Sequence, residues 1–443
     1  MKKADFLIAY EVKRRDLEYL TLLKVELERR GYVVVLDAAN RLRSYQKPIY
    51  EAEVVISGGF SYEFVNFGNS VSFRKAIELM TEQIKNSLEN NYIKERDDIG
   101  KDLVVNVWGN KQKERLIELE KVPGDKVFAL GSIDMDFLKP RFEKFDYSKE
   151  YIAKEYNLDP QKKWILFISS MTNVIGDDDE TDELGDNHIS DKLPDVYKSE
   201  RRKTKIICEK KTRKYLRQWF RRVFDEFPDA VIIYRPHPVE MISDKFLEFE
   251  KEYEGFKIIR DYSVRQWIKV CEKCYNWYST SGIQAYFINK PFYILRPVPI
   301  DRDIEVECFK NTDKYITTYE MFRETILNDA SLSEYSPIDP SIYDYYAFSN
   351  QEYTYEKVAD MCEEIFKNDQ YIVPEKHIEL LKKCIKSQWK KSSFKEKIAL
   401  FGRRTIFYGL YHKLFSPNVD YMNTSNKELM ALEKRIRECI STK

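Results

Sequence analysis

Short apolar runs alternate with amphipathic segments along the first third of the chain. Each run has the composition of a strand buried on both faces, and several of the segments between them carry apolar residues at helical spacing. Strands separated by helices predict an open parallel sheet with right-handed crossovers. The expected strands are 5–10, 32–36, 54–57, 103–107 and 126–130, and the expected helices are 17–30, 71–91 and 111–120.

The pattern restarts after a charged and aromatic joint at 141–159, which predicts a second open α/β sheet. Its strands are expected at 164–168, 231–234, 257–259, 275–278 and 292–295, with an amphipathic helix at 210–227. From about residue 343 onward the chain is mostly polar, with candidate helices at 353–368 and 374–386.

These patterns predict the fold class, which is α/β with two Rossmann-like parallel-sheet domains and a helical C-terminal extension. The expected segments are an N-terminal domain at 1–140, a linker at 141–160, a second domain at 161–335 and the extension at 336–443. Because open α/β sheets bind ligands at the carboxyl ends of their strands, candidate site residues are expected directly after the strands.

Composition limits the function classes. The 443 residues include 74 basic and 74 acidic residues, so no global charge points to nucleic acid as a partner. Seven cysteines at irregular spacing, with no signal peptide, predict a cytoplasmic protein without a disulfide framework. No apolar run reaches the ~20 residues needed to cross a bilayer, which predicts a soluble or peripheral protein.

The clearest chemical signal follows the apolar run 230–233. Arg235 and His237 would emerge at the carboxyl end of that strand, between prolines that fix φ. About forty residues later, Ser279, Thr280 and Ser281 form a hydroxyl-rich turn between a strand and a helix, which offers backbone N–H groups to an anion. The two segments together predict a nucleotide-phosphate site. The alternative is a loop histidine and two helix-capping serines.

At this point the sequence resembles a known group of proteins. The stretch 234–238 (YRPHP), the serine turn followed by Ala285, and the dipeptide Lys290-Pro291 are similar to the donor half of bacterial surface-polysaccharide transferases with a His-Pro motif. That group includes capsule transferases of 3-deoxy-manno-octulosonic acid, sialyltransferases, and glycerophosphotransferases of teichoic acid synthesis. The segments 6–11, 107–112 and 131–136 resemble parts of surface carbohydrate biosynthesis proteins.

The resemblance implies a GT-B architecture, in which two Rossmann-like domains face each other across a cleft, with an N-terminal acceptor domain and a nucleotide-donor domain after it. It also implies a cytidine-nucleotide donor, whose phosphate the His-Pro histidine and the later serines contact. Gln284 stands where a ribose-binding glutamate often occurs, and its amide can still hydrogen-bond a diol. The expected donor-binding residues are Arg235, His237, Pro238, Ser279, Thr280, Ser281, Gln284, Ser169 and Ser170. For Ser169 and Ser170, an ordinary strand-to-loop transition is the alternative.

The resulting hypothesis is a glycosyltransferase that moves a sugar from a nucleotide donor to a surface glycan or a lipid-linked glycan. One alternative transfers a polyol phosphate from a CDP-linked donor, and another is a non-catalytic subunit that binds nucleotide sugars. No cofactor or metal ion is expected beyond the CMP- or CDP-linked donor.

Glu11, directly after the first strand, is the candidate general base for the acceptor hydroxyl. Its alternative is a helix-capping or salt-bridging glutamate near Arg14 and Arg15. Asp134 and Asp136, after Gly131, are weaker candidates for the base. Trp108 and Asn110 follow another strand and are candidates for acceptor binding, although a core tryptophan is the ordinary interpretation of Trp108.

Two charged segments remain. The acidic run 177–183 could hold a divalent metal, but consecutive carboxylates in a loop are usually solvated. The basic and aromatic stretch 382–415 suits either an anionic membrane surface or a helix that packs on one face.

Overall fold

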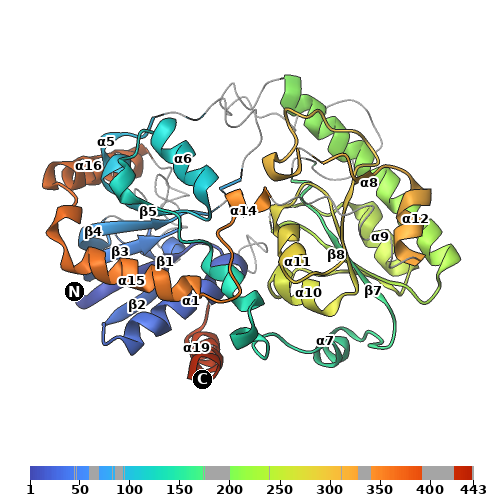
Figure 1. The fold of residues 1–443 in the computed structure, drawn as a ribbon, viewed down its shortest axis with the longest axis horizontal. Helices are drawn as coiled ribbons and strands as arrows, with labels where there is room; N and C mark the ends of the chain where they lie inside the picture. Colours follow the sequence, from blue (N-terminus) through green and yellow to red (C-terminus); the bar gives the residue numbers. More distant parts are fainter. Residues whose placement is uncertain are drawn as a thin grey trace. The chain divides into compact units, whose positions relative to one another are not determined.

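The computed structural model describes residues 1–43, 45, 47–58, 69–81, 83–84, 93, 95–172, 174, 200–238, 240–310, 312–327, 341–391 and 424–441. The chain forms two compact units, drawn as a ribbon in Figure 1. The first unit contains Met1–Gln83, Ile93–Phe145 and Tyr343–Lys443, and the second contains Ile84–Tyr92 and Asp146–Ile342.

The first unit contains a parallel sheet in the order β2-β1-β3-β4-β5-β6. Its strands are β1 (Lys2–Tyr10), β2 (Val34–Ala38), β3 (Tyr50–Ser57), β4 (Val71–Leu79), β5 (Val104–Asn106) and β6 (Val127–Phe128). The central strands are buried and apolar because helices cover both faces, as the sequence pattern predicts.

The helix expected at 71–91 is wrong, because residues 71–79 form strand β4. Exposed Ser72 and Arg74 alternate with buried Val71 and Phe73, which is the two-residue period of a strand. Lys75 hides this period in the sequence because it is a buried charge whose Nζ donates to the Phe366 carbonyl at 2.7 Å. Most of 80–91 lies outside the described residues.

Helices cover both faces of this sheet, and Figure 1 shows α1 and α15 on one side and α6 and α16 on the other. The C-terminal helices α15, α16 and α19 belong to this unit, and α15 and α19 pack on α1. The helices are α1 (Lys13–Arg29), α2 (Ala39–Leu42), α5 (Asp98–Asp102), α6 (Asn110–Glu118), α14 (Ile342–Tyr345, whose first residue is assigned to the second unit), α15 (Thr354–Lys367), α16 (Glu375–Lys391) and α19 (Asn426–Ser441).

The second unit contains another parallel sheet in the order β12-β11-β10-β7-β8-β9. Its strands are β7 (Trp164–Ile168), β8 (Val231–Arg235), β9 (Phe256–Ile258), β10 (Lys273–Asn276), β11 (Phe292–Leu295) and β12 (Tyr315–Ile316), and all except β12 were expected. Its helices are α7 (Lys149–Tyr156), α8 (Glu200–Glu226), α9 (Asp244–Glu252), α10 (Val264–Val270), α11 (Ile283–Phe287) and α12 (Tyr319–Leu327).

One face of this sheet packs against α8, α9 and α12 through a large aromatic core. Tyr234 of β8 lies in that core, with its ring 5.4 Å from Phe167 and 4.8 Å from Phe246. The two units therefore confirm a two-domain, Rossmann-like α/β fold.

Candidate functional site

Three adjacent strands of the second sheet end at the same level. In the parallel register, Ile168 of β7 lies beside Arg235 of β8 on one side and beside Asn276 of β10 on the other. The segments that begin at Ser169 and Pro236, and the turn that follows Asn276, therefore leave the same edge of one sheet. The structure brings together the three segments that the sequence selects for phosphate binding.

Arg235 is the last residue of β8, and its guanidinium contacts the loop after β9 rather than solvent. Its Nη1 donates to the Ile259 carbonyl at 3.0 Å and its Nη2 donates to the Tyr262 carbonyl, and the residue is 8% exposed. Tyr262 has a positive φ of 62°, a backbone conformation that is uncommon outside glycine. Arg235 thus stabilises the loop after β9 at the edge where a ligand is expected.

The backbone of His237 is held on two sides. Its N–H donates to Oε2 of Glu240 at 3.2 Å, and its carbonyl accepts from Nη1 of Arg260 at 3.0 Å. Arg260 also donates to the carbonyl of the exposed Pro238 at 3.2 Å. The imidazole is half-buried on a loop that its neighbours fix in place.

Glu240 is a functional candidate that the sequence reasoning missed. Its side chain is fully buried and accepts hydrogen bonds from the hydroxyls of Tyr234 at 2.6 Å and Ser169 at 2.9 Å. Burial raises the pKa of this carboxyl group, and this effect outweighs the opposing influence of Arg213 and the hydroxyl donors. The only signal in the sequence is a glutamate three positions after the His-Pro histidine, which does not reveal its burial.

Ser169 is 2% exposed, and its hydroxyl is engaged with Glu240. This geometry favours a supporting role for Ser169 over direct contact with a ligand. Ser170, the next residue, is half-buried and remains a candidate for direct contact.

The serine turn after β10 is built by local hydrogen bonds. Oδ1 of Asn276 accepts from the Ser279 N–H at 3.2 Å, and Oγ of Ser279 accepts from the Ser281 N–H at 3.3 Å. Gly282 is required here, because a Cβ at this position would lie 2.3 Å from the Phe292 ring. Tyr278, directly before the turn, has a positive φ of 61°.

The helix after the turn is short. It contains only Ile283–Phe287, preceded by the 3-10 turn Thr280–Gly282, so its dipole is small. Any anion site at this turn would depend on hydroxyl and backbone N–H groups rather than on a helix dipole. Gln284 is 7% exposed in the first turn of this helix.

Glu11 follows β1 in the first unit, as predicted. Its Oε2 accepts from Nη2 of Arg15 at 3.0 Å, and its side chain is 40% exposed. The carboxylate is therefore accessible but ion-paired. Asp136, a second candidate for the base, is fully buried and accepts from the backbone N–H groups of Thr354 and Tyr355 at the start of α15. Asp136 is thus engaged in structure.

Trp108 and Asn110 lie after β5 in the same unit. The Trp108 ring is half-buried and stacks on Tyr346 with ring centroids 5.4 Å apart, while Asn110 is exposed at the start of α6. A Cβ on Gly109 would lie 2.5 Å from the backbone of Tyr345, so the chain packs closely here. Stacking on Tyr346 occupies one face of the indole.

Other predicted features fall outside the described residues. They include the acidic run 177–183 and residues 392–415 of the basic and aromatic stretch. Within the described ranges, no group of three or more His, Cys, Asp or Glu side chains could hold a metal ion. No helix in those ranges combines the length and the apolar composition needed to span a membrane.

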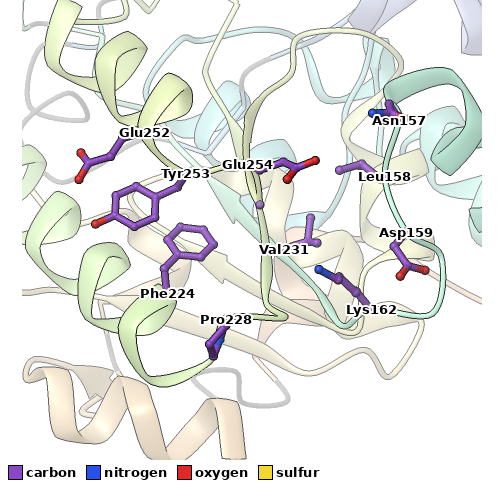
Figure 2. A pocket seen from close by; sticks show the side chains of 11 residues that line it. Asn157, Leu158, Asp159, Lys162, Phe224, Pro228, Val231, Glu252, Tyr253 and Glu254 are labelled. Carbon is purple, nitrogen blue, oxygen red and sulfur yellow. The ribbon is translucent and has the colours of Figure 1, made fainter.

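A shallow pocket of about 530 Å³ lies elsewhere on the second unit (Figure 2). Its lining includes Lys162 before β7, Val231 at the start of β8 and Gly255 before β9. These residues mark the amino edge of the sheet, opposite to the predicted phosphate site, and none of the predicted donor residues lines the pocket. We therefore keep the candidate site at the carboxyl edge of the sheet, where the predicted donor-binding residues follow β7, β8 and β10.

Comparisons with known proteins support the fold. No model of a known protein family matches the sequence, and no curated protein matches it. Among solved structures, a histidine-to-asparagine variant of the wall teichoic acid polymerase TagF soaked with CDPG has a TM-score of 0.54 at 12% identity, covering 82% of this chain and 89% of that chain. Another structure of TagF has a TM-score of 0.53 at 11% identity, with coverages of 82% and 88%.

A UDP-GlcNAc 2-epimerase from Neisseria meningitidis is also similar, with a TM-score of 0.49 at 12% identity, covering 82% of this chain and 100% of that chain. That similarity is too weak to support a functional argument. The similarity to TagF establishes a shared two-domain α/β architecture.

Proposed function

We propose that the protein is a GT-B-type glycosyltransferase that moves a sugar from a cytidine-nucleotide donor to a bacterial surface polysaccharide. The observation that carries the proposal is the common edge of β7, β8 and β10. There the loops that contain Ser170, His237 and Ser279 to Ser281 leave three neighbouring strands at one level. The carboxyl edge of an open α/β sheet is where such folds bind their ligands.

The chemistry of this edge suits a nucleotide diphosphate or monophosphate as leaving group. Negative charge accumulates on the phosphate oxygens when the bond to the sugar breaks, and preorganised donors at that position lower the barrier. The imidazole of His237 and the hydroxyls of the serine turn are donors of the required kind. The loop of His237 is fixed by Glu240 and Arg260, so little reorganisation is needed when the donor binds.

A second candidate function is transfer of a polyol phosphate from a CDP-linked donor. The observation that favours it is the fold similarity to TagF, one form of which was soaked with CDPG. Both functions use the same phosphate site, and the product separates them. A glycosyltransferase forms a glycosidic bond, whereas a polyol-phosphate transferase forms a phosphodiester.

In this proposal the partners are a nucleotide-linked donor and a glycan or lipid-linked glycan acceptor. The acceptor hydroxyl would be deprotonated by Glu11, and Trp108 and Asn110 would contact the acceptor. The protein would act in the cytoplasm or at the inner face of the plasma membrane.

The first test is a thermal-shift panel of cytidine, uridine and guanosine mono- and diphosphates. A ligand that binds only the folded state raises the melting temperature as its concentration exceeds Kd. We expect the cytidine nucleotides to give the largest shift. Equal shifts with all bases would contradict the cytidine assignment, and no shift with any nucleotide would contradict the proposed function.

A further inference from the structure

The loops after β7 and β8 are joined by one buried carboxylate. Oε2 of Glu240 accepts from the backbone N–H of His237 and from that of Met171, each at 3.2 Å. Met171 lies three residues beyond the end of β7, and His237 lies two residues beyond the end of β8. A single side chain therefore bonds the backbones of two of the three loops at the candidate phosphate edge.

The other carboxylate oxygen faces the interior of the unit. Oε1 accepts from the hydroxyls of Ser169 and Tyr234, whose oxygen atoms lie 3.0 Å apart. Tyr234 is fully buried between aromatic rings, so its hydroxyl has a fixed position. These contacts hold the carboxylate in one orientation, with Oε2 directed at the two backbone N–H groups.

Helix α8 closes this cluster from a third side. Nη2 of Arg213 lies 3.9 Å from Oε1 of Glu240 and donates to the carbonyls of Met171 at 3.1 Å and Met241 at 2.9 Å. Met171 is thus held through both its N–H and its carbonyl. The loop after β8 is held in the same way, because Arg260 donates to carbonyls on either side of position 239, at His237 and Glu240.

We propose that Glu240 is a positioning residue that couples the loop of His237 to the loop after β7 and so sets the nucleotide affinity of this edge. This inference rests on the proposed function for its ligand. A buried charge is costly, and a well-packed apolar residue would often stabilise the fold equally well. A geometric role at the site explains why a carboxylate occupies this position.

Ser169 gains a different role under this proposal. The sequence predicts direct contact of Ser169 with the nucleotide donor, whereas here Ser169 orients Glu240 through its hydroxyl. His237 contacts the ligand, and Glu240 acts through His237 and through the loop after β7.

The experiment compares Glu240→Gln with a matched control, Glu272→Gln, in the full chain. Glu272 also accepts from a backbone N–H, that of Trp164 at 2.6 Å, but it lies at the amino end of β7. An amide in place of Glu240 has only one acceptor oxygen, so it cannot serve the donors on both sides. The first readout is amide hydrogen exchange of the backbone at 171 and 237, which requires no ligand.

We expect exchange at both amides to accelerate by about tenfold or more in Glu240→Gln, because the charge-assisted bond at each amide is replaced, at most, by a weaker bond to a neutral amide oxygen. Glu272→Gln should leave both amides unchanged. Unchanged exchange in Glu240→Gln would overturn the coupling, whether or not the protein binds nucleotides.

The second readout is the affinity for cytidine diphosphate in the parent, Glu240→Gln, His237→Ala and the double variant. If Glu240 acts through His237, the Glu240→Gln substitution should weaken binding by about tenfold in the parent. In the His237→Ala background the same substitution should weaken binding by less than about threefold. If the role of Glu240 is purely structural, Glu240→Gln should lower the melting temperature and leave the affinity of the folded protein unchanged. Alternatively, its effect on affinity should add fully to that of His237→Ala. Either result would overturn the inference while the proposed function stands.

If Glu240→Gln does not fold, Glu240→Asp provides the same test. It keeps the charge but is shorter by one methylene, so it cannot reach both loops and should reproduce the loss of affinity. Nucleotide binding by Glu240→Asp equal to that of the parent would contradict the proposal. If the parent binds no nucleotide at all, the proposed function is wrong, and the exchange measurement alone decides the coupling.

Discussion

The carboxyl edges of the two sheets differ in how their candidate residues are arranged. In the second unit, the candidate loops follow β8, β7 and β10, which are adjacent strands. In the first unit, Glu11 follows β1 and Trp108 follows β5, and β3 and β4 lie between these strands. Neighbouring strands are spaced by ~4.8 Å, so the ends of β1 and β5 lie about 14 Å apart. The candidate phosphate site of the second unit is therefore supported by loops that lie close to one another. The candidate acceptor residues of the first unit lack this support, because they follow strands that are not adjacent.

Two buried glutamates sharpen this contrast. Glu26 of the first unit is 1% exposed and Glu240 of the second is 2% exposed, yet the pKa values of their carboxyl groups shift in opposite directions. Burial raises both, but hydrogen bonds from the guanidinium groups of Arg29 and Arg30 overcome this effect at Glu26 and lower its pKa. Glu240 is bonded mainly by neutral donors. Burial alone thus does not determine the direction of the pKa shift, because the hydrogen-bonding partners can reverse it.

The largest expected effect concerns Glu11. If it is the general base, Glu11→Gln should lower turnover by ~10²- to 10⁴-fold, because the amide keeps the shape but loses basicity. The melting temperature should change little, since an exposed ion pair contributes ~0.2–1 kcal/mol. Turnover and melting are measured on one preparation.

The control for Glu11 is Glu28→Gln, which removes an ion-paired carboxylate of α1 that is a partner of Lys24. It should leave turnover unchanged. Near-normal turnover in Glu11→Gln would instead show a structural ion pair with Arg15, and would favour a different base or a non-catalytic binding subunit.

A second prediction separates structure from chemistry at Asp136. Asp136→Asn leaves the buried Lys139 ammonium without its carboxylate and weakens the bonds at the start of α15, so stability should fall by about 3 kcal/mol. Chemical denaturation measures the loss. Turnover per folded molecule should stay normal, and a large loss of turnover without destabilisation would restore Asp136 as a candidate base.

The third prediction tests the contrast between Glu26 and Glu240 through pH. The lowered pKa of Glu26 contributes stability above its unfolded pKa of about 4.5, and that stability is lost as pH falls through the folded pKa. Glu26→Gln should therefore lower the melting temperature more at pH 7 than at pH 4. Each unit of pKa shift corresponds to about 1.4 kcal/mol.

For Glu240 the sign is reversed. Its raised pKa means that the folded state binds the proton more tightly, so its contribution to stability falls as pH rises through the interval above 4.5. The melting temperature of Glu240→Gln should therefore fall further below that of the parent at pH 4 than at pH 7. If the two variants lost melting temperature in the same way across this pH range, the environments of Glu26 and Glu240 would not differ as described.

The smallest expected effect concerns the basic tail. Replacing Lys390, Lys391 and Lys395 with Glu should reduce binding to anionic vesicles at an unchanged melting temperature, because each cation near such a surface contributes about 1 kcal/mol. Vesicle sedimentation measures the binding. Equal sedimentation of the variant and the parent would leave the tail with a packing role only.

The strands and their order of appearance were largely predictable from sequence, because parallel strands buried on both faces read as apolar runs. Strand β4 was missed because the buried Lys75 and its apolar neighbours imitate a helical period. The same limit applies to the site. His237 and the serine turn follow recognisable strands, whereas Glu240 is defined by contacts with residues from position 169 to position 237, which no local pattern encodes.

The most direct test of the central claim is a calorimetric titration of cytidine diphosphate into the parent, His237→Ala and His377→Ala. His377 is the matched control, because it is a buried histidine of the first unit paired with Asp102. Hydrogen bonds to charged groups contribute ~1.5–3 kcal/mol, so His237→Ala should weaken binding by at least about tenfold, while His377→Ala should bind like the parent. Equal affinity of the parent and His237→Ala would contradict a nucleotide-phosphate site at the carboxyl edge of the second sheet.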